Sequence, residues 1–210
     1  MGSQKRLIER VTDNKDKQRT YQIQLGRYKK AIANEFYFEG MMIVYGMLED
    51  RLRSFLYYIG AFRDVNEMKL CKTKAKSNDT LKRMYCSFLE VPTSSRMNFN
   101  NISTKMNMVR ATLRWVIDCD CTPVDEYLKV LKREYEGCVD LDGLLTTLDD
   151  IETWCKYRNE VVHGLLNKNT VSLEADLGEM VEKGMGYARF VDSQVKALKR
   201  KNAIRTALGI

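Results

Sequence analysis

Apolar residues recur at helical spacing along almost all of this 210-residue chain, and this periodicity restricts the fold more than any other feature. Residues three or four positions apart lie on one face of an α-helix, whereas a half-buried strand shows strict alternation, which no segment sustains. Only Pro92 and Pro123 interrupt the chain, so long helices are permitted nearly everywhere. The sequence therefore predicts an all-α bundle of about six or seven helices.

The segment at about residues 31–62 is the most hydrophobic and is the expected core helix. Further helices are expected at about 7–28, 79–89, 103–117, 123–135, 140–167 and 172–201, with loops at 63–78 and 92–101. The predicted organisation is an N-terminal basic helix (1–30), one helical domain (31–202) and a C-terminal tail (203–210).

The net charge of +7 is unevenly distributed along the chain. Residues 1–35 carry nine Lys or Arg against four acids, and 183–210 carry seven against one, whereas 137–182 carry three against ten. Basic ends suit a polyanion, with RNA as the first candidate, although solvated helix ends have the same composition. The candidate RNA-binding residues are Lys196, Lys199, Arg200 and Lys201.

Six cysteines form no C-x-x-C pair and are interpreted as reduced thiols. Cys119 and Cys121, each beside an aspartate, could hold a metal in principle, but small buried thiols are the simpler interpretation. We predict neither a metal nor a cofactor. No apolar run approaches the roughly 18 residues that span a bilayer, and no apolar leader opens the chain, so we expect a cytoplasmic protein without membrane contact.

The only histidine, His163, ends the run RNEVVH (158–163) inside the helix expected at 140–167. At about 100° per residue, Arg158 falls close to the centre of that helix's apolar stripe, so its guanidinium must be paired or face a wet interface. Asn159 and His163 are four residues apart and share one flank of the helix. Glu49, in the expected core helix, is the carboxylate we expect to orient Arg158. An arginine paired at a helix interface and a histidine that donates an N–H near the helix end would show the same spacing.

The run RNEVVH resembles the R-x(4–6)-H motif of the HEPN superfamily, a group of small all-helical proteins. In that family a polar residue directly follows the arginine, as Asn159 does here, and a long helix follows the motif. The segment VYGMLEDRLR (44–53) also resembles the family's early core helix. The resemblance covers about residues 31–200 in outline and is specific only in the motif. Leu165 replaces the tyrosine of the variant paired with a nucleotidyltransferase, which disfavours that branch.

The resemblance implies a metal-independent endoribonuclease that acts as a homodimer, with two motifs meeting across the interface. Its implied roles are general acid or base for His163, stabilisation of the phosphate charge for Arg158, and orientation of either group for Asn159. The products would be a 2′,3′-cyclic phosphate and a 5′-hydroxyl. Such an enzyme would be a toxin or phage-defence effector, restrained by an antitoxin or another regulatory protein.

Two other interpretations remain open. The first is a non-catalytic HEPN-like module that binds RNA, a nucleotide or a partner protein, since a fold does not settle a function. The second is an unrelated helical adaptor, whose methionine-rich segments pack against another protein. A buried His163, or two motifs far apart in the dimer, would favour the module over the enzyme. Monomeric behaviour without nucleic-acid binding would favour the adaptor.

Overall fold

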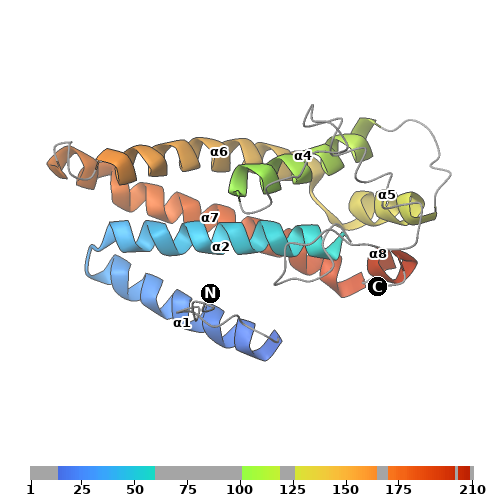
Figure 1. Cartoon of the computed structure of the whole chain (residues 1–210), viewed down its shortest axis with the longest axis horizontal. Coiled ribbons are helices and arrows are strands. Elements are labelled where there is room, and N and C mark those ends of the chain that lie inside the picture. Colours follow the sequence, from blue (N-terminus) through green and yellow to red (C-terminus); the bar gives the residue numbers. More distant parts are fainter. Residues whose placement is uncertain (1–13, 60–100, 119–125, 165–169, 202, 209–210) are drawn as a thin grey trace, which may run out of the picture.

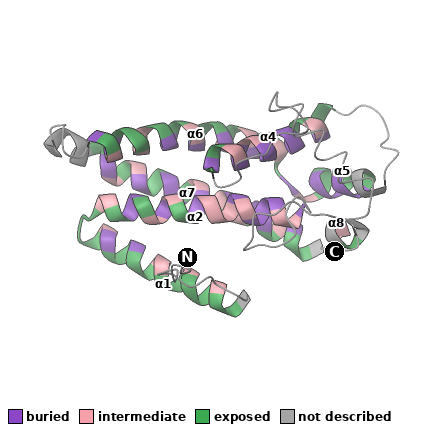
Figure 2. Ribbon diagram, in the orientation of Figure 1, coloured by how far each residue is buried: buried purple, intermediate pink, exposed green. Residues whose placement is uncertain are grey.

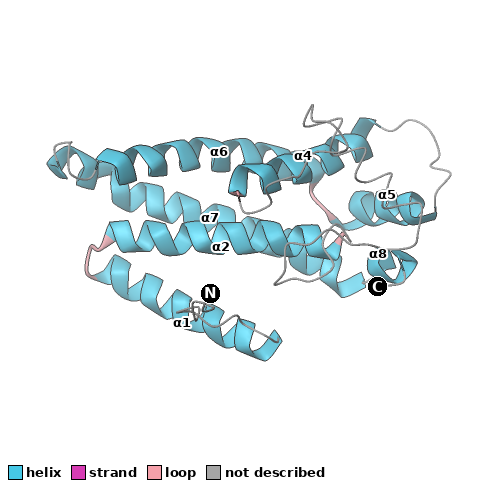
Figure 3. Ribbon diagram, viewed as in Figure 1, coloured by secondary structure: helices cyan, strands magenta, loops and turns pink. Residues whose placement is uncertain are grey.

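The computed structural model describes residues 14–59, 101–118, 126–164, 170–201 and 203–208. Within these ranges every regular element is an α-helix and no strand occurs, which confirms the all-α class (Figure 3). The helices are α1 (Asn14–Ala33), α2 (Tyr37–Tyr58), α4 (Ile102–Asp118), α5 (Glu126–Cys138), α6 (Leu141–Gly164), α7 (Thr170–Lys201) and α8 (Ala203–Leu208). The helix expected at 79–89, the loop at 63–78 and most of the loop at 92–101 lie outside the described residues.

Helix α2 is the centre of the bundle, as the hydrophobicity of its segment predicts. It packs against α7 along much of its length, with α1 and α4 on its other sides, and α6 lies over α4 and α7 (Figure 1). Its Val44, Leu48 and Leu52 side chains are completely buried. Figure 2 shows buried residues on every long helix, and the buried apolar residues of these helices form one cluster.

The turn between α1 and α2 differs from the prediction, which began the core helix at residue 31. Helix α1 continues to Ala33 and closes with the backbone N–H of Phe36 donating to the Ala31 carbonyl at 2.8 Å and that of Glu35 donating to Ile32 at 3.1 Å. This pair of hydrogen bonds is a Schellman motif, which requires a left-handed residue. Glu35 takes that position with a φ of 59°.

Both ends of the described chain belong to the bundle. Tyr28 and Ala31 of α1 are buried in the core, so the basic N-terminal helix packs onto the domain that follows it. The segment predicted as a C-terminal tail contains α8, which packs against α5 and buries Ile204. None of the described helices is both long and apolar enough to cross a bilayer.

Two local contacts fix the start and the packing of α6. The Asp140 carboxylate accepts the backbone N–H of Gly143 at 3.0 Å and so caps the start of α6. Further along, the Trp154 indole N–H donates to the Met180 carbonyl of α7 at 2.7 Å. Gly184, one turn later on α7, leaves the space that the indole ring occupies. This contact sets the register of α6 against α7.

Among the described cysteines, Cys138 and Cys155 form no disulfide, and the Cys138 thiol donates to the Glu134 carbonyl at 2.6 Å. Burial raises the pKa of Cys155 to about 11, so this thiol stays protonated at neutral pH. Cys119 and Cys121, the pair considered as metal ligands, lie outside the described residues.

Candidate functional site

The apolar stripe predicted for the motif helix is present on α6. Ile151, its expected centre, is completely buried, and so are most of its predicted neighbours. These neighbours are Leu144, Leu148, Trp154, Cys155 and Val161. Val162, at the edge of the stripe, is half-buried, and the side chain of Leu165 lies outside the described residues.

Arg158 extends from this stripe onto the surface of α2. Its guanidinium carbon lies 4.4 Å from the centroid of the Tyr45 ring, and its Nη2 lies 3.4 Å from the sulfur of Met42. Its Nη1 donates to the Asn159 side-chain carbonyl at 2.9 Å. No carboxylate pairs with Arg158 among the described residues, and its Nε is buried without a hydrogen-bond partner. Arg158 is therefore a positioned, half-buried cation without a counter-ion.

Glu49 does not orient Arg158, contrary to the prediction. Its carboxylate instead accepts from Lys105 of α4, with Oε1 and Nζ 2.8 Å apart. Lys105 is completely buried, and burial lowers its pKa, while the hydrogen bond that it donates to Glu49 partly offsets that shift. A buried ammonium needs a partner more than a half-exposed guanidinium does, because desolvation penalises its charge. The Glu49 carboxylate therefore pairs with Lys105 of α4 and not with Arg158 of the motif.

Asn159 and His163 both lie exposed on α6, as their shared flank predicts. The Asn159 side-chain carbonyl accepts a hydrogen bond from Arg158, so in this structure Asn159 orients the arginine and not the histidine. His163 lies in the last turn of α6 and makes no hydrogen bond or ion pair with the described residues. Its imidazole is therefore accessible to a ligand from solvent.

The candidate RNA-binding residues do not lie beside the motif. Lys196, Lys199 and Arg200 are exposed near the end of α7, and the side chain of Lys201 lies outside the described residues. Helices α6 and α7 are antiparallel, so from the level of Trp154 the motif and these cations extend in opposite directions (Figure 1). At 1.5 Å per residue, His163 and Lys196 are separated by roughly 30 Å along the bundle.

Acidic residues of α6 have partners away from the motif. Arg110 of α4 donates to Asp149 at 2.7 Å and to Glu152 at 2.9 Å. The hydrogen bond from Arg110 is the main reason that the pKa of Glu152 lies below its ordinary value. These two carboxylates are thus partly neutralised by α4, which weakens their repulsion of a phosphate near Arg158.

Tyr45 and Met42 are site residues that the sequence did not indicate. Both lie on α2, where an aromatic and a methionine are ordinary core residues. Their spacing of three places them on one face, but periodicity does not say that this face meets Arg158.

No family model, curated protein or solved structure matches this chain. The resemblance to the HEPN superfamily therefore depends on the residues between Arg158 and His163 and on their helical setting.

Proposed function

We propose that this protein is a metal-independent endoribonuclease of the HEPN type, with a site built from Arg158, Asn159 and His163. The observation that carries the proposal is the Arg158 guanidinium, which is fixed by Tyr45 and Asn159 but has no carboxylate partner among the described residues. A guanidinium of this kind suits a phosphodiester, because it offers charge and two parallel donors to the phosphate oxygens. An exposed histidine in the same helix supplies the second group that the reaction needs.

The chemistry requires little more than these groups. RNA carries its own nucleophile, the 2′-hydroxyl, which attacks the adjacent phosphorus and expels the 5′-oxygen of the next nucleotide. An imidazole can accept or donate a proton, so His163 can take the hydroxyl proton or return one to the leaving oxygen. Arg158 stabilises the negative charge that grows on the phosphate. The products are a 2′,3′-cyclic phosphate and a 5′-hydroxyl.

The complete site is proposed to form between two copies of the chain. Arg158 and His163 point about 140° apart around α6 at 100° per residue. One copy therefore does not bring both side chains to the same phosphate, and we propose that the second copy supplies the other of the two. Met42, beside the guanidinium, exposes 38% of its surface and would be covered in such a dimer. A cytoplasmic toxin or phage-defence effector is the biological role that we infer, with an antitoxin or regulatory protein as its restraint.

The test is cleavage of a mixed-sequence RNA by purified protein in excess EDTA. Wild type should cut, and Arg158→Ala and His163→Ala should each lose at least about a hundredfold in rate, as expected for a charge stabiliser and a proton-transfer group. Glu160→Ala is the matched control, because Glu160 is exposed in the same motif and forms no ion pair with the described residues. It should cut like wild type.

Three further measurements make the outcome specific. Cyclic-phosphate ends should appear on the products, and a 2′-deoxy substrate should resist cleavage because it lacks the nucleophile. Circular dichroism should show the same helical content in all variants. Equal cutting by wild type and both motif variants would overturn the assignment of the site.

The non-catalytic module is the second candidate, and one observation favours it. The exposed lysines of α7 lie roughly 30 Å from His163 along the bundle, so RNA bound by these lysines would lie away from the motif. A module of this kind would bind RNA without cutting it. Fluorescence anisotropy with the same RNA separates the two: binding without products supports the module, and products support the enzyme.

A further inference from the structure

A cleft of about 470 Å³ lies between α1, α2 and α7, far from the motif on α6. Basic side chains from all three helices line it: Lys17 of α1, Arg51 of α2, and Lys196 and Lys199 of α7. Asp192 is the only carboxylate among its lining residues. The lining therefore brings together cations that are distant in sequence.

The surrounding carboxylates do not balance this charge. Asp50 is shared by Lys17 at 3.0 Å, Arg53 at 2.9 Å and Arg51 at 3.4 Å. Asp192 is shared by Arg51 and Lys196, each at 2.7 Å.

Lys199 pairs with no carboxylate among the described residues. Four cations line the cleft, and they share two carboxylates, one of which also pairs with Arg53, so positive charge is in excess at the cleft.

Water screens this excess only in part. The side chains of Lys17 and Arg51 expose 18% and 15% of their surface, so both charges are substantially desolvated. Burial is the main cause that lowers the pKa of Lys17, although Asp50 opposes the shift. An anion entering the cleft would offset this cost, because charges attract more strongly where water is displaced.

Neutral donors complete the cleft. The Tyr21 hydroxyl accepts from Arg51 Nε at 2.8 Å, and burial raises the pKa of Tyr21 to about 12, so the hydroxyl keeps its proton and can donate it. The buried Ser54 hydroxyl accepts from Lys17 at 3.4 Å and also has a proton to donate. Hydroxyl and guanidinium donors together are typical partners of phosphate oxygens.

We propose that this cleft binds the phosphate of a small nucleotide, held by Lys17, Arg51 and Lys199. Its volume lies within the roughly 300–1,000 Å³ of small-molecule sites. Tyr58 lines the same cleft and offers an aromatic ring to a nucleobase. The site is separate from the motif on α6, so it does not depend on the nuclease proposal.

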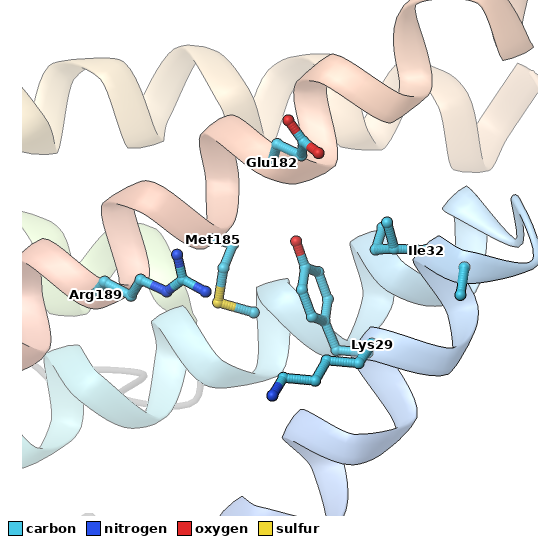
Figure 4. Close-up of a pocket in the computed structure, with 7 residues that line it drawn as sticks. Lys29, Ile32, Glu182, Met185 and Arg189 are labelled. Carbon is cyan, nitrogen blue, oxygen red and sulfur yellow. The ribbon is translucent and has the colours of Figure 1, made fainter.

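A second cleft of about 580 Å³ provides the control. It lies between α1 and α7 and is lined by Lys29, Glu182 and Arg189, among others (Figure 4). Replacing Lys29 or Arg189 by glutamine removes one positive charge from α1 or α7, as replacing Lys17 or Lys199 does. They leave Lys17, Arg51 and Lys199 in place.

The experiment is titration calorimetry of the full chain at low salt with adenosine 5′-monophosphate, inorganic phosphate and adenosine. Adenosine monophosphate and phosphate should bind, and adenosine should bind at least about tenfold more weakly than its monophosphate, because it lacks the charged group. Lys17→Gln and Lys199→Gln should each weaken nucleotide binding about three- to tenfold, the loss expected for one ordinary hydrogen bond. Lys29→Gln and Arg189→Gln should bind like wild type.

Lys199 is exposed and makes no ion pair with the described residues, so Lys199→Gln tests the cleft without disturbing the fold. Equal binding of adenosine and its monophosphate would overturn the proposal, as would no binding of the monophosphate at millimolar concentration. Equal weakening by Lys29→Gln would mean diffuse charge attraction. Loss of nucleotide binding in Arg158→Ala, with Lys17→Gln and Lys199→Gln unaffected, would move the ligand to the α6 motif and overturn this assignment.

Discussion

The guanidinium carbon of Arg158 lies 4.4 Å from the centroid of the Tyr45 ring, which joins the motif helix to the central helix of the bundle. A cation held over an aromatic face gains about 0.5–2 kcal/mol, depending on how far it is desolvated. Arg158 is half-buried and has no carboxylate partner among the described residues, so this contact and the bond to Asn159 determine where its charge lies.

A double-mutant cycle should detect this contact as a coupling in stability. We expect Arg158→Ala and Tyr45→Leu to show a coupling of about 0.5–1 kcal/mol in the free energy of unfolding, measured by urea denaturation. Tyr45→Phe should keep most of the coupling, because the ring remains. Tyr187→Leu is the control, since Tyr187 is a half-buried tyrosine of α7 without a contact to Arg158, and its coupling should be near zero. A coupling of equal size with Tyr187 would contradict the proposed contact.

The Lys105–Glu49 pair should respond unequally to the loss of either partner. Removing the carboxylate in Glu49→Ala leaves a completely buried ammonium unpaired, so we expect a loss of about 1–3 kcal/mol in unfolding free energy. Lys105→Met removes the buried charge and keeps the volume, while Glu49, 30% exposed, can be hydrated. This variant should be neutral or more stable by about 1 kcal/mol.

Lys156→Met is the matched control for the lysine substitution. Its side chain is 71% exposed and lies 3.4 Å from Glu152, so it should change the unfolding free energy by less than about 0.5 kcal/mol. Chemical denaturation at neutral pH measures all three variants. A strongly destabilised Lys105→Met would show that the ion pair is a net source of stability and contradict the prediction.

Local features of the fold were predictable from the sequence, and contacts between helices were less so. The apolar stripe of α6 follows from the spacing of neighbouring residues, and it is confirmed. The break at Glu35 was missed, because the left-handed position that ends a helix is usually glycine and here it is glutamate.

The predicted contact of Arg158 was wrong by one helical turn: Arg158 lies over Tyr45 and does not pair with Glu49. Glu49 follows Tyr45 by four residues on α2, so both lie on one face, and periodicity cannot choose between them. The choice is made by Lys105, which comes from α4 and is distant in sequence. The separation of His163 from Lys196 could have been inferred, because consecutive antiparallel helices place the end of the second far from the end of the first.

Gly184 and Gly186 should respond in opposite directions to the same substitution. A methyl group on Gly184 would lie 2.7 Å from the Trp154 ring, whereas one on Gly186 meets nothing within 4 Å. Trp154 is buried and its indole N–H is bonded to Met180, so the ring has little freedom to withdraw. Gly184→Ala should therefore cost about 1–3 kcal/mol in unfolding free energy. Gly186→Ala should gain up to about 1 kcal/mol, because alanine is the better helix former. Equal effects would mean that α6 and α7 are not packed at this register.

The contact between Arg110 and Glu152 should make part of the stability depend on pH. Arg110 holds the pKa of Glu152 below its ordinary value of 4.5 in the folded protein. A carboxylate with a lowered pKa binds fewer protons when folded than when unfolded, so its contribution is fully present well above pH 4.5 and is lost as the pH falls through the folded pKa. Glu152→Gln should therefore be less stable than wild type at pH 7, with the difference shrinking in acid.

The measurement is the urea unfolding free energy of both proteins between pH 7 and pH 3, taken as a difference at each pH. Asp150→Asn is the control, because Asp150 is an exposed carboxylate on the same helix that forms no ion pair with the described residues. Its difference from wild type should stay flat, because Asp150 has no ion pair with the described residues that acid could break. A flat difference for Glu152→Gln would mean that Asp149 alone holds Arg110, and that the second hydrogen bond does not stabilise the fold.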